Sequence, residues 1–125
     1  VLIVEDEEQV RVLAESILQG GGHRTLSAAT LDQALALTTV EQSIDLLFTD
    51  INLAADVASG LVHPGLELAQ QANKLRPDLR VLYTTGAAVT DGMKALFVEG
   101  AEFLPKPYNI DQLTTKVGEI TSKAD

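Results

Sequence analysis

The sequence contains no cysteine, and aromatic residues make up only 4% of its 125 residues. A chain without cysteine forms no disulfides and carries no thiol redox chemistry, and this composition fits a reducing cytoplasm. Hydrophobic residues nevertheless reach 46% of the chain, and most of them are aliphatic. We therefore expect one domain, residues 1–125, with a core packed through Leu, Val, Ile and Ala side chains.

Basic residues are scarce as well: nine Lys and Arg stand against 18 Asp and Glu, which gives a formal net charge of −9. Such a surface repels nucleic-acid phosphates and anionic membranes. No apolar run approaches the roughly 20 residues needed to cross a bilayer, and the first residues lack the basic and apolar segments of a secretion signal. We expect a soluble, cytoplasmic protein that binds neither nucleic acid nor membrane directly.

The chain alternates between two hydrophobic patterns. Short apolar or β-branched runs predict strands at 1–4, 23–27, 45–49, 80–84 and 102–104. Apolar residues at helical spacing predict helices over 10–18, 31–37, 66–75, 93–97 and 110–120. Five such units imply an α/β fold: a doubly wound, flavodoxin-like parallel sheet of order 2-1-3-4-5 with helices on both faces.

Local signals mark several boundaries of these elements. Asp6 with Gln9 and Thr30 with Gln33 have the spacing of capping boxes, while glycines at 20–22 predict the end of the first helix. Residues 52–65 are too long for an ordinary strand-to-helix turn, and we expect them to be irregular.

Polar residues occupy the carboxyl ends of the predicted strands, where an open parallel sheet binds its ligands. In chain order they are Glu5, Asp6, Asp50, Thr84, Thr85 and Lys106. Three carboxylates crowded together repel one another and favour a hard divalent cation with oxygen ligands, Mg²⁺ or Mn²⁺. Beside such a cation, Asp50 is the best-placed nucleophile for a phosphoryl group. Thr84 could donate its hydroxyl to a phosphoryl oxygen, and Lys106 could pair with Asp50 or its phosphate.

This ordered set, over essentially the whole chain, resembles the receiver domains of response regulators. The resemblance implies that Glu5, Asp6, Asp50 and the backbone carbonyl of Asn52 bind Mg²⁺. It implies that Asp50 accepts a phosphoryl group from a phosphohistidine of a histidine kinase or phosphotransfer domain. Thr84 and Lys106 would hold the phosphoryl oxygens, and the protein would be a signalling phosphoacceptor that catalyses its own phosphorylation and dephosphorylation, not a turnover enzyme.

The same resemblance implies a switch. Thr84 would move toward the phosphate, Phe103 would turn inward, and the face built from 93–97, 102–104 and 110–120 would change its population of states. That face would contact a downstream partner or attached domain, or form a homodimer. The bond from Lys106 to Pro107 is expected to be cis. Residues 83–86 and 104–108 look most like receivers of hybrid histidine kinases, while a stand-alone receiver stays open.

Two departures from the family pattern stand out. The acidic pair is Glu-Asp where Asp-Asp is more usual, which lengthens one metal ligand. The segment from 53 to 64 is several residues longer than is typical, so the approach of a kinase or phosphatase over it would differ.

Each site residue has a simpler interpretation when taken alone: a helix cap for Asp6, a turn for Asp50, a strand residue for Thr84, a loop lysine for Lys106. Their joint order favours the phosphorylation site. His23, within the second predicted strand, and His63 have no partner at metal-ligand or triad spacing, so we interpret both as structural.

Three other classes of function stay open. A phosphatase of the haloacid-dehalogenase type needs a second acid where this chain has Asn52. A flavin-binding electron carrier needs a phosphate loop after the first strand, where this chain has acids. A degenerate receiver that serves only for docking is disfavoured by the intact set.

Overall fold

The computed structural model describes residues 1–41 and 43–122. Its sheet has five parallel strands in the order β2-β1-β3-β4-β5. The strands are β1 (Leu2–Val4), β2 (Leu26–Ala28), β3 (Leu46–Asp50), β4 (Arg80–Thr85) and β5 (Glu102–Pro105). The predicted fold class and strand order are confirmed.

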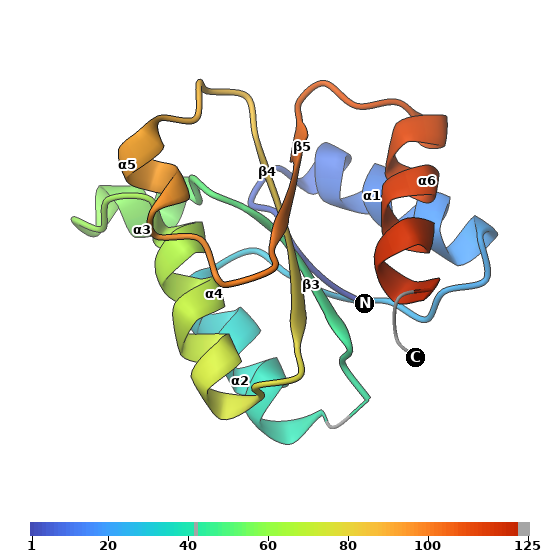
Figure 1. Ribbon diagram of the computed structural model, residues 1–125, viewed down its shortest axis with the longest axis horizontal. Coiled ribbons are helices and arrows are strands. Elements are labelled where there is room, and N and C mark those ends of the chain that lie inside the picture. The colour runs from blue at the N-terminus through green and yellow to red at the C-terminus, as the bar shows by residue number, and fades with distance from the viewer. Residues whose placement is uncertain (42, 123–125) are drawn as a thin grey trace.

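Helices cover both faces of this sheet (Figure 1). In chain order they are α1 (Glu8–Gly20), α2 (Leu31–Val40), α3 (Ala54–Ala58), α4 (Pro64–Leu75), α5 (Asp91–Lys94) and α6 (Ile110–Ser122). Two aliphatic cores result, one between the sheet and α2, α4 and α5, the other between the sheet and α1 and α6. Successive side chains of a strand enter opposite cores, as Leu2 and Ile3 do. The uninterrupted apolar runs over all of β1 and over residues 46–48 of β3 follow from this burial on both sides.

Two predicted boundaries are wrong. The second strand begins at Leu26, not at residue 23, because Leu26 pairs with Leu2 at the start of β1 and the residues before it have no strand to extend. His23 therefore lies outside the strand. The predicted helix over 93–97 is reduced to α5, ending at Lys94. The amides of Leu96 and Phe97 bond to carbonyls three residues back, as in a turn, and the chain then leaves the helical path: the amide of Val98 donates to the Tyr83 hydroxyl.

Neither of the two predicted capping boxes is complete: Oε1 of Gln33 accepts from the amide of Ala29 and not from that of Thr30, so only the Thr30 half of that box forms. Thr30 caps α2, its Oγ1 accepting from the amide of Gln33 at 3.3 Å. Asp6 does not cap α1, which begins after Glu7 without a side-chain cap. The Asp6 carboxylate instead accepts a hydrogen bond from the amide of Ala54.

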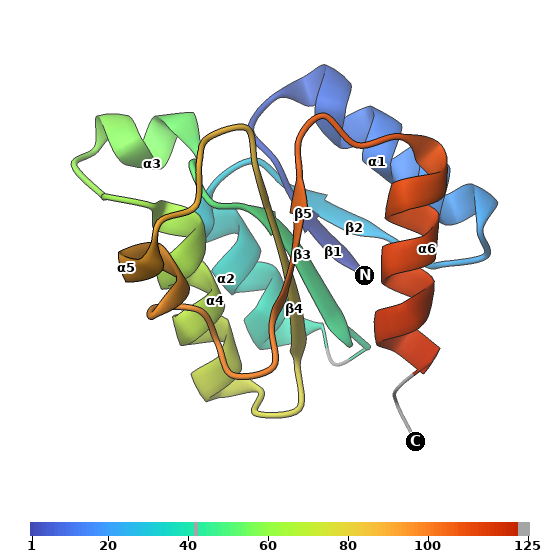
Figure 2. The ribbon, with the colours of Figure 1, turned by 45° about the horizontal axis from the view of Figure 1, so that its top comes forward.

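The segment predicted to be irregular, 52–65, contains a helix. After β3 the chain forms α3, turns through Gly60 at a φ of 102°, and enters α4 at Pro64 (Figure 2). Oδ2 of Asp56 accepts from the amide of Leu31 at 2.9 Å, which fastens α3 to the start of α2. The tertiary contact supplies what the local sequence pattern did not reveal. Within the described ranges, no helix has the length and apolar character of a membrane span.

Candidate functional site

The strand register brings the predicted residues to one edge of the sheet. Asp50, the last residue of β3, lies opposite Thr84 of β4, and Thr84 lies opposite Leu104 of β5. Glu5 follows β1, the other neighbour of β3. Because parallel strands share one carboxyl edge, side chains more than 100 residues apart in the chain meet there.

Three carboxylates form the centre of this site. Glu5, Asp6 and Asp50 each offer an oxygen within 4.8 Å of the others. Glu5 and Asp50 are buried, with 4% and 6% of their surfaces exposed, while Asp6 is half-buried. Nζ of Lys106 lies 2.5 Å from Oε1 of Glu5 and 2.9 Å from Oδ2 of Asp50. The lysine thus bridges two of the carboxylates and leaves the third toward solvent.

The site carries more negative than positive charge. Burial raises the pKa of the Glu5 carboxyl to about 7; the hydrogen bond from Lys106 opposes this rise, and the Asp6 and Asp50 carboxyls add to it. Burial alone would lower the pKa of Lys106, but its bonds to Glu5 and Asp50 outweigh burial and raise it. Lys106 is therefore firmly cationic, and one cation among three acids leaves room for another. An oxygen donor set with uncompensated charge fits Mg²⁺.

The remaining oxygen of Asp50 is held by the backbone. Its Oδ1 accepts a hydrogen bond from the amide of Asn52 at 3.0 Å, while Oδ2 accepts from Lys106. Both carboxylate oxygens therefore have a partner. Asn52 lies two residues after the end of β3, and its hydrogen bond to Oδ1 holds its backbone beside the acidic cluster.

Thr84 presents a different feature. Thr84 is buried, with 3% of its surface exposed. Within the described ranges, its Oγ1 is the one buried side-chain oxygen or nitrogen that has no hydrogen-bond partner. A buried hydroxyl without a partner costs free energy, on the order of 1–3 kcal/mol. Its position across from Asp50 means that an oxygen-rich group on that carboxylate would satisfy it.

Phe103 lies within β5, and the bond between Lys106 and Pro107 follows the end of this strand. Phe103 is half-buried and packs against the core beneath α2, α4 and α5. The bond between Lys106 and Pro107 is cis, as the resemblance implied.

Two neighbours of the site were not found from the sequence. The Arg11 guanidinium donates to the backbone carbonyl of Glu5 at 2.8 Å. His63 was interpreted as structural; it is half-buried, but its Nδ1 lies 3.0 Å from Oδ1 of Asn52. Nothing in the local sequence around His63 marks this contact, because the segment that brings it back includes the unexpected α3.

Mg²⁺ affinity is expected to rise with pH from about 6 to about 8. Below a pKa of about 7 Glu5 holds a proton in the metal-free protein, and a metal ligand must release it, at a cost of up to about tenfold in affinity per pH unit. Calorimetric titration with Mg²⁺ across this range measures the effect. Glu5→Gln has nothing to titrate and should bind more weakly with a flatter profile; equal pH profiles for the two proteins would contradict the expectation.

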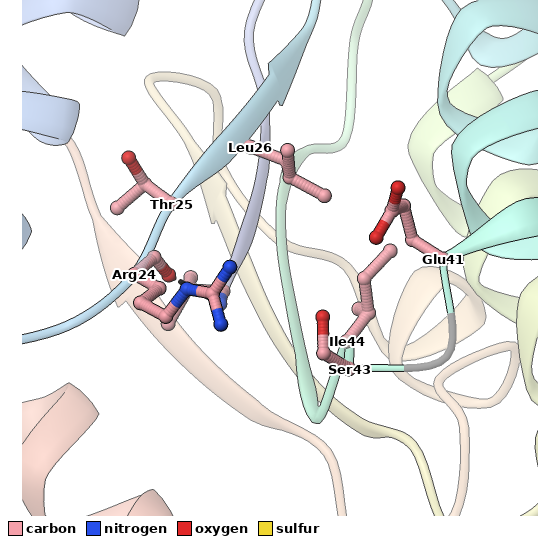
Figure 3. Close-up of a pocket in the computed structure, with 7 residues that line it drawn as sticks. Arg24, Thr25, Leu26, Glu41, Ser43 and Ile44 are labelled. Atoms are coloured by element: carbon pink, nitrogen blue, oxygen red, sulfur yellow. Dashed lines mark hydrogen bonds between the residues drawn. The ribbon is translucent and has the colours of Figure 1, made fainter.

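A small pocket at the other end of the sheet is not part of this site. It lies between the start of β2 and the segment before β3, where Arg24, Leu26 and Glu41 surround it (Figure 3). None of the clustered carboxylates lines it, so its chemistry is separate.

Comparison with known proteins agrees with the fold and identifies a family. The family model for the response regulator receiver domain matches residues 1–118. The chain is 29% identical over 127 residues to the sensor kinase CckA of Brucella abortus (strain 2308), over 100% of this chain and 13% of that protein. It is 26% identical over 118 residues to sporulation initiation phosphotransferase F of Bacillus subtilis (strain 168), over 94% of this chain and 89% of that protein.

A solved structure shows the same likeness. The receiver domain of NtrX from Brucella abortus matches with a TM-score of 0.80 and 31% identity, over 99% of this chain and 98% of that one. The chain spans half or less of the length of CckA and of several transcriptional regulators that it matches. On its family match and its fold, the chain belongs to the response regulator receiver domains of two-component systems.

Proposed function

We propose that Asp50 is the phosphoacceptor of this receiver domain and that Glu5, Asp6, Asp50 and the carbonyl of Asn52 hold the Mg²⁺ or Mn²⁺ that the transfer requires. The observation that supports this best is the buried Asp50 carboxylate, flanked by two further acids, a lysine ammonium and an unpartnered threonine hydroxyl. Each of these groups has a part in phosphoryl transfer.

The transfer itself is a displacement at phosphorus. An oxygen of Asp50 forms a bond to the phosphorus of a phosphohistidine on a histidine kinase or phosphotransfer domain. The phosphorus–nitrogen bond breaks, and its electron pair remains on the imidazole, which takes up a proton from solvent. The divalent cation, when bound, offsets the negative charge on the transferring oxygens.

The protein's own side chains then hold the new phosphoryl group. Lys106, already 2.9 Å from Oδ2 of Asp50, supplies a cation to its oxygens. Thr84 donates its unpartnered hydroxyl, which gives the phosphorylated form a hydrogen bond that the unmodified form lacks. This difference between the two forms is what biases a two-state switch.

We propose that phosphorylation of Asp50 changes the conformation of the face formed by α5, β5 and α6, here named the output face. Phe103 of β5 is its switch residue, packing deeper when Thr84 moves. The output face contacts a downstream protein, an attached domain or a second copy of the chain.

In this proposal residues 1–125 form one cytoplasmic receiver domain. The domain catalyses its own phosphorylation and dephosphorylation and does not turn over a free substrate. With a net charge of −9 it makes no direct contact with nucleic acid or membrane.

Intact-mass spectrometry tests the assignment. The protein is incubated with Mg²⁺ and acetyl phosphate, and in parallel with a phosphorylated histidine kinase, with EDTA as a control. One hydroxylamine-labile phosphoryl adduct that EDTA abolishes supports an aspartyl-phosphate receiver. No adduct from either donor would favour the docking-only receiver instead.

Lys106→Ala is expected to separate cation binding from the switch. Lys106 is not a cation ligand, so Mg²⁺ binding persists, but the phosphoryl group loses the ammonium that ties it to β5. Amide chemical shifts of the output face should then stay unchanged on phosphorylation. The exposed Lys74→Ala serves as the matched control and should respond like the parent protein. A full response in Lys106→Ala would refute the role.

A further inference from the structure

The side chain of Asn52 is held at both ends of its carboxamide. Its Oδ1 lies 3.0 Å from Nδ1 of His63, and its Nδ2 donates to Oγ1 of Thr85 at 3.4 Å. Because a carboxamide oxygen only accepts, His63 is the donor in this pair. The backbone amide of Asn52 also donates a hydrogen bond to the Asp50 carboxylate. The residue whose side chain is held in this way therefore contacts the proposed phosphoacceptor directly.

The backbone places His63 at this position. His63 adopts a left-handed conformation, with φ 53° and ψ 61°, at the residue before α4. Two residues later the amide of Gly65 donates to the carbonyl of Ile51 at 2.7 Å. A Cβ on Gly65 would lie 2.0 Å from the carbonyl oxygen of Asp50, so only glycine allows this approach. The start of α4 is therefore packed on the end of β3, and His63 is carried with it.

The opposite rim of the site is open. Gly86, just after β4, has no side chain, and a Cβ there would meet only the Cβ of Lys106 at 4.0 Å. Gly86 and Ala87 are both exposed. No side chain at Gly86 covers this side of the site, so water can approach it there, where Thr85 contacts the half-buried Asn52.

We propose that His63 is a positioning residue that slows hydrolysis of phosphorylated Asp50 by keeping Oδ1 of Asn52 engaged and its carboxamide turned toward Thr85. This rests on the proposed function of Asp50. In hydrolysis a water oxygen bonds to phosphorus, the bond from phosphorus to the Asp50 oxygen breaks, and its electron pair restores the carboxylate. Inorganic phosphate leaves and a proton passes to solvent. The contacts to His63 and Thr85 occupy one of the two lone pairs of Oδ1 and fix the direction of the other, whereas a released carboxamide could rotate, accept from that water and orient it for attack.

Three substitutions of His63 distinguish the effect of its hydrogen-bond donor from the effect of its backbone conformation. His63→Phe keeps a planar ring but removes the donor. His63→Gly removes the side chain and relieves the left-handed strain, so the fold is preserved. His63→Gln retains an N–H donor and tests rescue. Each protein is phosphorylated with acetyl phosphate and Mg²⁺, freed of the donor by rapid desalting, and followed by intact mass.

The Phe and Gly variants are expected to lose the phosphoryl group about two- to tenfold faster, the range of one neutral hydrogen bond, with unchanged rates of adduct formation. The Gln variant should stay close to the parent. In an Asn52→Ala background, His63→Phe should have no further effect, since the residue through which it acts is gone. A merely structural role would not produce this coupling.

Other results would overturn the inference. Unchanged or longer half-lives in the Phe and Gly variants would do so, as would an equal effect of His63→Phe with and without Asn52. If the parent protein forms no adduct, the failure is that of the proposed function of Asp50, and the two failures are thus distinguished.

Discussion

Asp50→Asn is expected to reduce the phosphoryl adduct to background while the protein stays folded. A carboxamide has no anionic oxygen to attack phosphorus, so the covalent step is lost. The substitution is nearly isosteric. Oδ1 can still accept from the amide of Asn52, and Lys106 keeps its bond to Glu5. One of three crowded negative charges is also removed, which relieves repulsion in the metal-free protein.

The measurement is intact mass after incubation with acetyl phosphate and Mg²⁺, with far-ultraviolet circular dichroism to verify folding. Asp78→Asn is the matched control, because Asp78 is exposed and precedes β4 at the opposite end of the sheet. It should be labelled like the parent protein. Labelling of Asp50→Asn at an undiminished level would refute Asp50 as the acceptor.

The largest effect on stability is expected from Gly65→Ala. An added Cβ would lie 2.0 Å from the carbonyl oxygen of Asp50 and 2.6 Å from Cα of Ile51, and both are backbone atoms that do not rotate away. Relief requires α4 to move off the end of β3. Overpacking of this kind costs about 1–3 kcal/mol and occasionally more, a large part of the 5–15 kcal/mol that typically holds a domain together.

Urea unfolding of the two proteins measures the difference in the free energy of unfolding. Gly118→Ala is the control: Gly118 lies within α6, and a Cβ there would have no atom within 4 Å. That substitution should stabilise the protein by roughly 0.5–1 kcal/mol through helix propensity. If Gly65→Ala proves as stable as the parent, the close packing of α4 on Asp50 is not rigid, and the placement of His63 loses its support.

The sequence by itself determined the architecture and most of the candidate site. Apolar residues recurring at helical spacing, between short buried runs, predicted the α/β sheet and its order. Polar residues at the strand ends predicted which side chains would meet, because the carboxyl ends of parallel strands share one edge. Both inferences use local periodicity, which needs no knowledge of distant contacts.

Only the tertiary structure decided the details that depend on partners far along the chain. β2 starts where β1 offers it a partner, and α3 is fastened by Asp56 to the first turn of α2. The bridge from Lys106 to Glu5 spans 101 residues, and it is burial in that cluster that raises the pKa of Glu5 to about 7. His63 reaches Asn52 through backbone packing of Gly65. Distances and burial arise when the chain closes on itself, so no local pattern encodes them.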